Sequence, residues 1–168
     1  MCYNSWFKLL PALDPKRDFL LKGIKQGFDI IDTSIIEQET NTCTNNYQSA
    51  TKYPNRVPVE NQILQEVQNY RYKIVKYKPK IISALGAIPK KGSTDFRLIH
   101  DCSRPPGAAL NDYAIANQFH YQTIQDAMDI IQPGDYMAKI DLSKAFRSVK
   151  IHPSNHQFTG LQWSFNNN

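Results

Sequence analysis

Apolar residues recur at every third or fourth position in three parts of the chain, which is the spacing of one helix face. This spacing predicts helices over residues 14–28, 58–70 and 123–132. Pro58 suits the first turn of the second helix, and Thr123 with Asp126 forms a candidate capping box at the start of the third. Polar, Asn- and Thr-rich residues 38–56 predict a connection, and the Pro-Pro-Gly run in 104–118 predicts a loop.

Strand-length apolar runs follow the second helix. Residues 81–88 and 96–102 are apolar, and the polar, turn-rich segment between them predicts a β-hairpin with a basic tip. Alternation over 136–142 places Tyr136, Ala138, Ile140 and Leu142 on one face of a strand. Two more strands are predicted over 147–151 and 158–165. Helices and strands that do not alternate strictly indicate an α+β fold.

Composition is that of an ordinary globular domain, with 41% hydrophobic and 21% charged residues in a chain of 168. Twenty basic residues against 15 acidic ones favour polyanionic partners, but mildly. No apolar run approaches the roughly 18 residues of a membrane span, and no basic region precedes the short apolar stretch near the amino terminus. We therefore expect an intracellular protein, in cytoplasm or nucleus, that is neither secreted nor bound to a membrane. The three scattered cysteines predict free thiols.

Basic residues concentrate in the stretch 71–91, which contains no acid. They are Arg71, Lys73, Lys76, Lys78, Lys80, Lys90 and Lys91. Tyr70, Tyr72 and Tyr77 lie beside them, and such a mixture suits phosphate contact and base stacking. A solvated cationic face explains the same pattern equally well.

Asp141 closes a predicted apolar strand beside a turn. A carboxylate there can present oxygens to a hard divalent cation such as Mg²⁺, although a turn-initiating aspartate is the simpler interpretation. His152 and His156 are four residues apart, but the intervening Pro153 disfavours the helix that a metal site at this spacing needs. We interpret both histidines as surface residues.

These segments, in this order, resemble the reverse transcriptases of retroelements. Residues 87–101 (AIPKKGSTDFRLIHD) look like the fingers hairpin of that family, and 136–146 (YMAKIDLSKAF) look like its first palm motif. Residues 149–153 and 158–163 match the next two palm strands. Within the family, RLIHDCSRPPG followed by LND is similar to the tyrosine-recombinase (DIRS-like) branch. The resemblance spans about 18–165 and is strongest over 85–165.

The resemblance implies a partial polymerase fingers and palm, with an antiparallel sheet and flanking helices. Its expected parts are an N-terminal helix and polar linker over 1–57, a fingers-like region over 58–122, and the start of the palm over 123–168. It also implies RNA or DNA template-primer and a deoxynucleoside triphosphate as partners. The basic residues of 71–91 would then contact nucleic acid.

Roles for single residues follow from the same resemblance. Asp141 would bind catalytic Mg²⁺, and Phe146 would lie under the sugar and exclude a 2′-hydroxyl. The backbone amides of Lys144 and Ala145 would meet the triphosphate. Lys90 and Arg97 would hold its β- and γ-phosphates, with Lys91 in place of Lys90 if the hairpin register shifts by one. Phe146 as an ordinary core aromatic, and Asp101 as a residue that orders the fingers, are the simpler interpretations.

No Asp or Glu follows Asp141, so the family's second palm motif with paired aspartates is absent from this sequence. Two-metal nucleotidyl transfer needs several carboxylates at one site. One hypothesis is therefore a fragment of an RNA-directed DNA polymerase that is inactive by itself. This hypothesis leaves open whether a partner chain covers the truncated palm. The other is a non-enzymatic remnant of a retroelement that binds nucleic acid or protein. We expect an uncovered sheet edge to favour aggregation or a partner.

Overall fold

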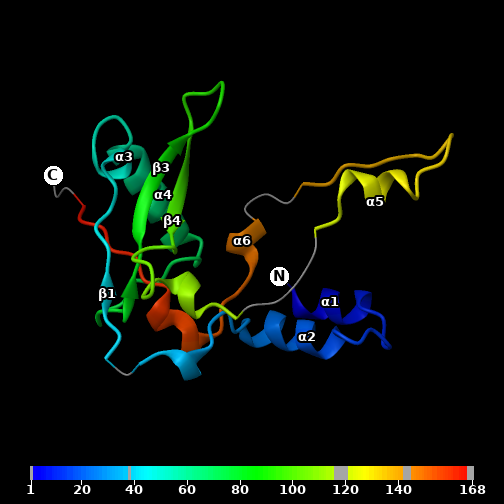
Figure 1. The fold of residues 1–168 in the computed structure, drawn as a ribbon, viewed down its shortest axis with the longest axis horizontal. Helices are drawn as coiled ribbons and strands as arrows, with labels where there is room; N and C mark the ends of the chain where they lie inside the picture. Colours follow the sequence, from blue (N-terminus) through cyan, green and yellow to red (C-terminus); the bar gives the residue numbers. More distant parts are fainter. Residues whose placement is uncertain (1, 38, 116–120, 142–144, 166–168) are drawn as a thin grey trace.

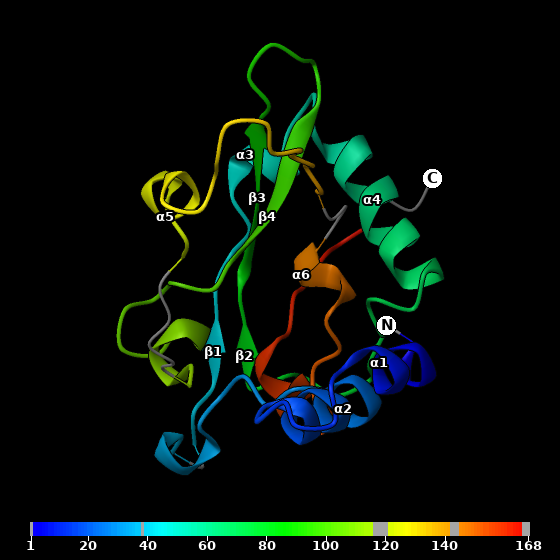
Figure 2. The ribbon, with the colours of Figure 1, turned by 90° about the vertical axis from the view of Figure 1, so that its right-hand side faces the viewer.

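The computed structural model describes residues 2–37, 39–115, 121–141 and 145–165, which form a mixed α+β structure (Figures 1 and 2). The α-helices are α1 Tyr3–Leu9, α2 Arg17–Gln26, α3 Gln48–Thr51, α4 Arg56–Gln68, α5 Ile124–Met128 and α6 Ala145–Ser148. The strands are β1 Thr42–Cys43, β2 Ile81–Ile82, β3 Ala84–Pro89 and β4 Phe96–Asp101. Short 3-10 helices are η1 Thr33–Ile35, η2 Leu110–Tyr113 and η3 Pro153–Phe158.

The predicted hairpin is confirmed. Strands β3 and β4 pair antiparallel from Ala84 opposite Asp101 to Pro89 opposite Phe96, and the segment 90–95 forms the turn (Figure 1). Strand β1 pairs in parallel with β2. It lies inside the stretch 38–56, which the sequence predicts as a connection. Two residues are too few to show alternation, so this short strand leaves no pattern to detect.

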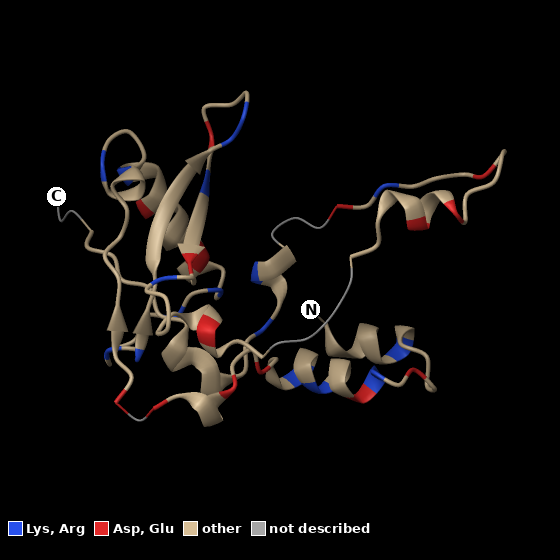
Figure 3. Cartoon of the chain, in the orientation of Figure 1, with Lys and Arg blue, Asp and Glu red and all other residues tan. Residues whose placement is uncertain are grey.

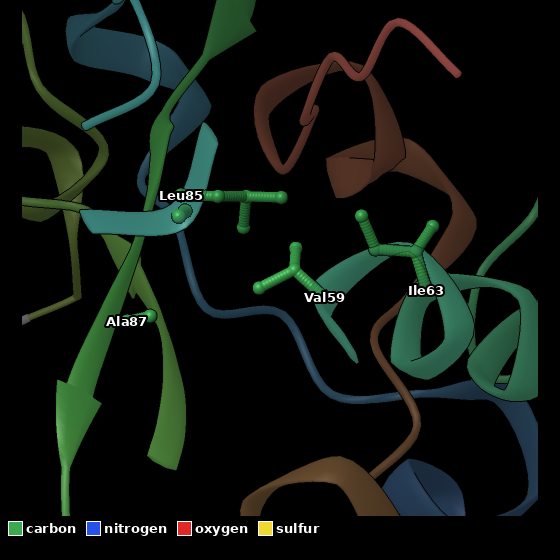
Figure 4. Close-up of a cluster of buried hydrophobic side chains, with 5 residues drawn as sticks. Val59, Ile63, Leu85 and Ala87 are labelled. Atoms are coloured by element: carbon green, nitrogen blue, oxygen red, sulfur yellow. The ribbon is translucent and has the colours of Figure 1, made fainter. Parts of the chain in front are cut away.

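Helix α4 covers one face of the hairpin. Val59 and Ile63 of α4 and Leu85 and Ala87 of β3 are buried together with Ala50 of α3 (Figure 4). Leu85 and Ala87 are two positions apart, so both point to the same face of β3. The predicted helix over 58–70 is thus confirmed, although α4 begins two residues earlier, at Arg56.

A second buried cluster joins parts that are distant in sequence: Ile31, Ile81, Leu110 and Phe158. Close to this cluster in sequence, the segment that follows α2 forms backbone hydrogen bonds with the segment that precedes η3. Phe28 N donates to Lys150 O at 2.8 Å. The two backbones approach closely because Gly27 has no side chain; a Cβ there would lie 2.5 Å from His152 N, and its φ of +103° also favours glycine.

The three strands predicted over 136–142, 147–151 and 158–165 are wrong. Within the described residues, 136–141 is extended but unpaired, 145–148 is α6, and 153–158 is η3. Single bridges remain, Phe28 to Ile151 and Ile82 to Gly160. A strand needs a neighbour along its length to satisfy its amides. In the described chain 136–141 has none, and each of the two later segments has one at a single residue.

The third predicted helix is short. Thr123 and Asp126 do form the capping box, but α5 spans only Ile124–Met128 and its apolar face is exposed. Segment 121–141, which carries α5, extends away from the hairpin in Figure 1. The first predicted helix is confirmed as α2, and no helix in the described parts is long and apolar enough to cross a membrane. Cys2, Cys43 and Cys102 are free thiols, as predicted.

Candidate nucleic-acid interface

Two lysines lie at the exposed turn of the hairpin. Lys90 donates its backbone N–H to Asp95 O at 2.9 Å, and its Nζ lies 3.4 Å from Asp95 Oδ2. Both side chains are well exposed, so this ion pair is weak and a polyanion can displace it. Lys91 is exposed beside it. The turn therefore presents positive charge in a position that a phosphate can reach.

Arg97 is exposed on β4, opposite Ile88. Neighbouring strand residues point to opposite faces, and Phe96 points toward the α4 cluster, so Arg97 points to the other face. Lys90 instead lines an open hollow of about 720 Å³ between the hairpin and α4, together with Phe96 and amide side chains of α4. The structure thus gives no contact between the two cations that the resemblance assigns to one triphosphate.

Three lysines of the basic stretch stand in solvent after α4. Lys73, Lys76 and Lys78 are exposed, and none of them has an ion pair within the described chain. Tyr70 and Tyr77, on the same segment, are 97% and 54% exposed. Figure 3 shows the cations of the described chain spread over several elements. We define Lys73, Lys76, Lys78, Tyr70 and Tyr77 as the basic segment.

Three other residues of the stretch are held in the fold. Lys80 is half-buried, and its backbone bonds to both Gln157 O and Thr42 N. Arg71 forms an ion pair with Glu66 at 3.2 Å. Tyr72, expected beside the cations as a stacking surface, is half-buried against the α4 cluster and its hydroxyl accepts a bond from Arg147. Burial raises the pKa of Tyr72. Tyr72 is therefore not a free stacking platform.

A buried carboxylate that the sequence did not single out lies at the centre of this arrangement. Glu66 of α4 is fully buried, 3.2 Å from Arg71 and 3.8 Å from Arg147 of α6. The Arg147 guanidinium also lies over the Tyr72 ring, 5.3 Å from its centroid. A signal was present, because Glu66 follows Val59 and Ile63 at helical spacing and so falls on the buried face.

The structure does not gather the predicted palm residues into a metal site within the described chain. Asp141 is exposed on the unpaired segment, and no hydrogen bond or ion pair reaches it from the described residues. Phe146, in the short helix α6, is 93% exposed and is not a core aromatic. Ala145 begins α6 and is half-buried, whereas Lys144 lies outside the described residues.

Mg²⁺ does not fit the residues that the structure brings together. Within the described parts, no three His, Cys, Asp or Glu side chains gather where they could hold a metal ion. Mg²⁺ requires about six oxygen ligands in octahedral geometry, and one exposed carboxylate supplies too few of them.

Two polar residues at the end of β4 fix the base of the hairpin. Asp101 accepts hydrogen bonds from the Ser103 hydroxyl and backbone and from the Tyr47 hydroxyl, and these bonds lower the pKa of Asp101. His100 Nε2 donates to Gly160 O at 3.1 Å, and burial lowers the pKa of His100. His152 is the N-cap of η3 and His156 lies within that helix, and within the described chain neither belongs to a group of side chains that could hold a metal ion.

A scan against protein-family models, a search of curated proteins and a search of solved structures found no match for this chain.

Proposed function

We propose that this chain is the fingers and the beginning of the palm of a retroelement reverse transcriptase, and that it binds single-stranded template through the basic segment. The observation that carries the proposal is the hairpin β3–β4, which presents Lys90 and Lys91 at an exposed turn and Arg97 at an exposed position on β4. The resemblance assigns the triphosphate to these same residues.

The basic segment supports strand binding by its chemistry. Exposed lysines without ion pairs attract phosphates, and exposed tyrosine rings offer faces on which bases of any sequence can stack. Because Lys73, Lys76 and Lys78 follow one another along an irregular segment, they track an extended backbone rather than one groove of a duplex. We therefore expect a preference for single strands or for the overhang of a template-primer.

Strand binding is tested by fluorescence anisotropy with a labelled single-stranded RNA over a series of salt concentrations. Replacing Lys73, Lys76 and Lys78 together by alanine should weaken binding and reduce the slope of log K against log salt by about 2, because each phosphate contact contributes about 0.7 on a single strand. The matched control replaces three exposed lysines elsewhere in the chain, namely Lys8 on α1, Lys22 on α2 and Lys52 after α3. Equal losses in both variants would contradict a specific strand site.

Nucleotide binding is tested separately. Lys90→Ala with Arg97→Ala should weaken deoxynucleoside triphosphate binding, measured by calorimetry, while strand binding keeps most of its affinity. The isolated chain should not extend a primer, because its sequence lacks the paired aspartates of the second palm motif. Magnesium-dependent extension that Asp141→Ala abolishes would overturn this part of the proposal.

A second candidate is a non-enzymatic module that binds nucleic acid or protein. It is favoured by the isolation of Asp141, which has no carboxylate neighbours at metal-binding positions within the described chain. Strand binding without any effect of triphosphate would support this candidate over the first. A partner chain that supplies the missing carboxylates would instead support the polymerase fragment.

A further inference from the structure

Strand β4 has an open edge. The N–H and C=O groups of Leu85 and the N–H of Ala87 point away from β4. Leu85 O accepts a hydrogen bond from Tyr47 N, and Leu85 N donates to the Asn46 side chain. Ala87 N donates to the Ser49 hydroxyl. In an antiparallel pair the bonding residues alternate, so the opposite residues of β4 also turn their N–H and C=O groups outward. By the register these are His100, Leu98 and Phe96. Pro89 lies opposite Phe96, at a position where the alternation points the backbone nitrogen away from β4. A proline fits there because no N–H is needed for the ladder.

This edge has no backbone partner in the described chain. The other edge of the hairpin is covered by residues 46–49, whereas the backbones of Phe96, Leu98 and His100 make no hydrogen bond outside the hairpin to the described residues. Exposed, unpaired strand edges recruit further strands, because their amides remain unsatisfied by protein. An extended segment whose side chains alternate in register with those of β4 can therefore pair with this open edge.

The same chain carries such a segment. Residues 136–141 are extended and exposed, and no backbone hydrogen bond joins them to the described residues. Tyr136 and Ile140 are 104% and 86% exposed and share one face by alternation. Figure 1 shows this segment extended away from the β4 of its own chain, so in this conformation it is free for a neighbouring molecule.

Charge and pattern select one register. With Arg97 opposite Asp141, an antiparallel pairing places Leu98 opposite Ile140 and His100 opposite Ala138. The outward residues of β4 then bond to the added strand, while Arg97 and Asp141 form a non-hydrogen-bonded pair, in which side chains approach most closely. A shift of two residues in one direction sets Arg97 against Lys139, which is repulsive. A shift of one residue turns Asp141 and Lys139 toward the apolar face.

We infer that two copies of this chain associate by strand exchange, each adding its segment 138–141 to the β4 edge of the other in this antiparallel register. The interface is isologous, so both ladders form together in a two-fold dimer. The inference does not rest on the proposed function. It does limit that function, because Arg97 is paired with Asp141 in the dimer and is free for nucleotide only in the monomer.

Charge reversal tests the register. Arg97→Asp and Asp141→Arg, each alone, place like charges opposite each other in both ladders and should raise the dimer dissociation constant at least roughly tenfold. An equimolar mixture of the two variants restores both opposite-charge pairs and should form heterodimers. The readout is sedimentation velocity over a concentration series, with far-UV circular dichroism to confirm that each variant is folded. Both positions are exposed, so neither change disturbs the core.

The alternatives give different results. The double variant Arg97→Asp/Asp141→Arg carries both reversed charges in one chain. If the wild-type dissociation constant returns in this variant but not in the mixture, the two residues pair within one chain and the exchanged-strand dimer is wrong. A wild-type chain that stays monomeric at all concentrations overturns it as well. Ile140→Pro removes the amide that bonds to Leu98 and should abolish the dimer, whereas Ile140→Val should preserve it. An equal effect of both Ile140 variants would also contradict the ladder.

Discussion

Replacing Glu66 by glutamine removes the negative charge between two arginines while it keeps the shape of the side chain. The carboxylate is fully buried, and its Oε2 lies 3.2 Å from Arg71 and 3.8 Å from Arg147. Glu66→Gln should therefore destabilise the protein by leaving two cations beside an uncharged group. It should also loosen α6, because Arg147 attaches that helix to α4.

The magnitude follows from burial. Removing one partner of a buried ion pair costs about 3–5 kcal/mol. The two arginines are 32% and 23% exposed, so they can regain water and the lower end applies. The glutamine carbonyl still accepts a hydrogen bond, which offsets about 1 kcal/mol. We expect a net loss of about 2–3 kcal/mol, equivalent to a fall in melting temperature of about 5–10 °C for a domain of this size.

The assay is urea unfolding followed by circular dichroism and by tryptophan fluorescence, because Trp163 packs against the α4 cluster. The matched control is Glu37→Gln, the same chemical change at an exposed position. Its free energy of unfolding should stay within about 0.5 kcal/mol of wild type. A Glu66→Gln variant as stable as this control would refute the reasoning, and a double-mutant cycle with Arg147→Gln would then show no coupling.

Three further predictions concern stability. Gly27→Ala should cost more than Gly92→Ala, because both have positive φ but only Gly27 has backbone within 2.5 Å of the added Cβ; thermal melts that rank them the other way would contradict the close approach. Tyr47→Phe should lower stability by about 1 kcal/mol and raise the pKa of Asp101, measured by carboxyl NMR titration, since a hydrogen bond to the carboxylate is lost. Burial lowers the pKa of His100 below its ordinary 6.5, so the unfolded chain binds a proton that the folded chain excludes. Stability should therefore fall as the pH drops through 6.5, and less steeply in His100→Gln; equal slopes would exclude His100 as the cause.

Local patterns were enough where a segment provides its own partner. The hairpin was predictable because two apolar runs flank a short polar turn, and α4 was predictable because its apolar face repeats along one helix. The capping box of Thr123 and Asp126 was also predictable, since both residues lie in the same turn. Each of these elements satisfies most of its backbone hydrogen bonds within a few residues.

The candidate site was predictable only in part. The exposed positions of Lys90 and Arg97 follow from the hairpin pattern, but their contacts do not, since Lys90 turns toward α4 and pairs with Asp95. The role of Arg71 depends on Glu66, and a buried acid five residues earlier is invisible until the two are packed together. Charge runs indicate where cations are numerous and give no information on which of them are already paired.

By itself, the sequence determined the hairpin, the helices α2 and α4, the free thiols and the concentration of cations after α4. Only the tertiary structure decided which strand-like runs become strands, because alternation shows that a segment can pair but not that a neighbour exists. It also decided that Arg71 and Arg147 reach the buried Glu66, and that within the described chain both the segment 136–141 and one edge of β4 lack a backbone partner. The physical reason is the same in each case: helical bonds and hairpin turns are local, whereas buried charges and sheet edges are satisfied by residues far away in the chain.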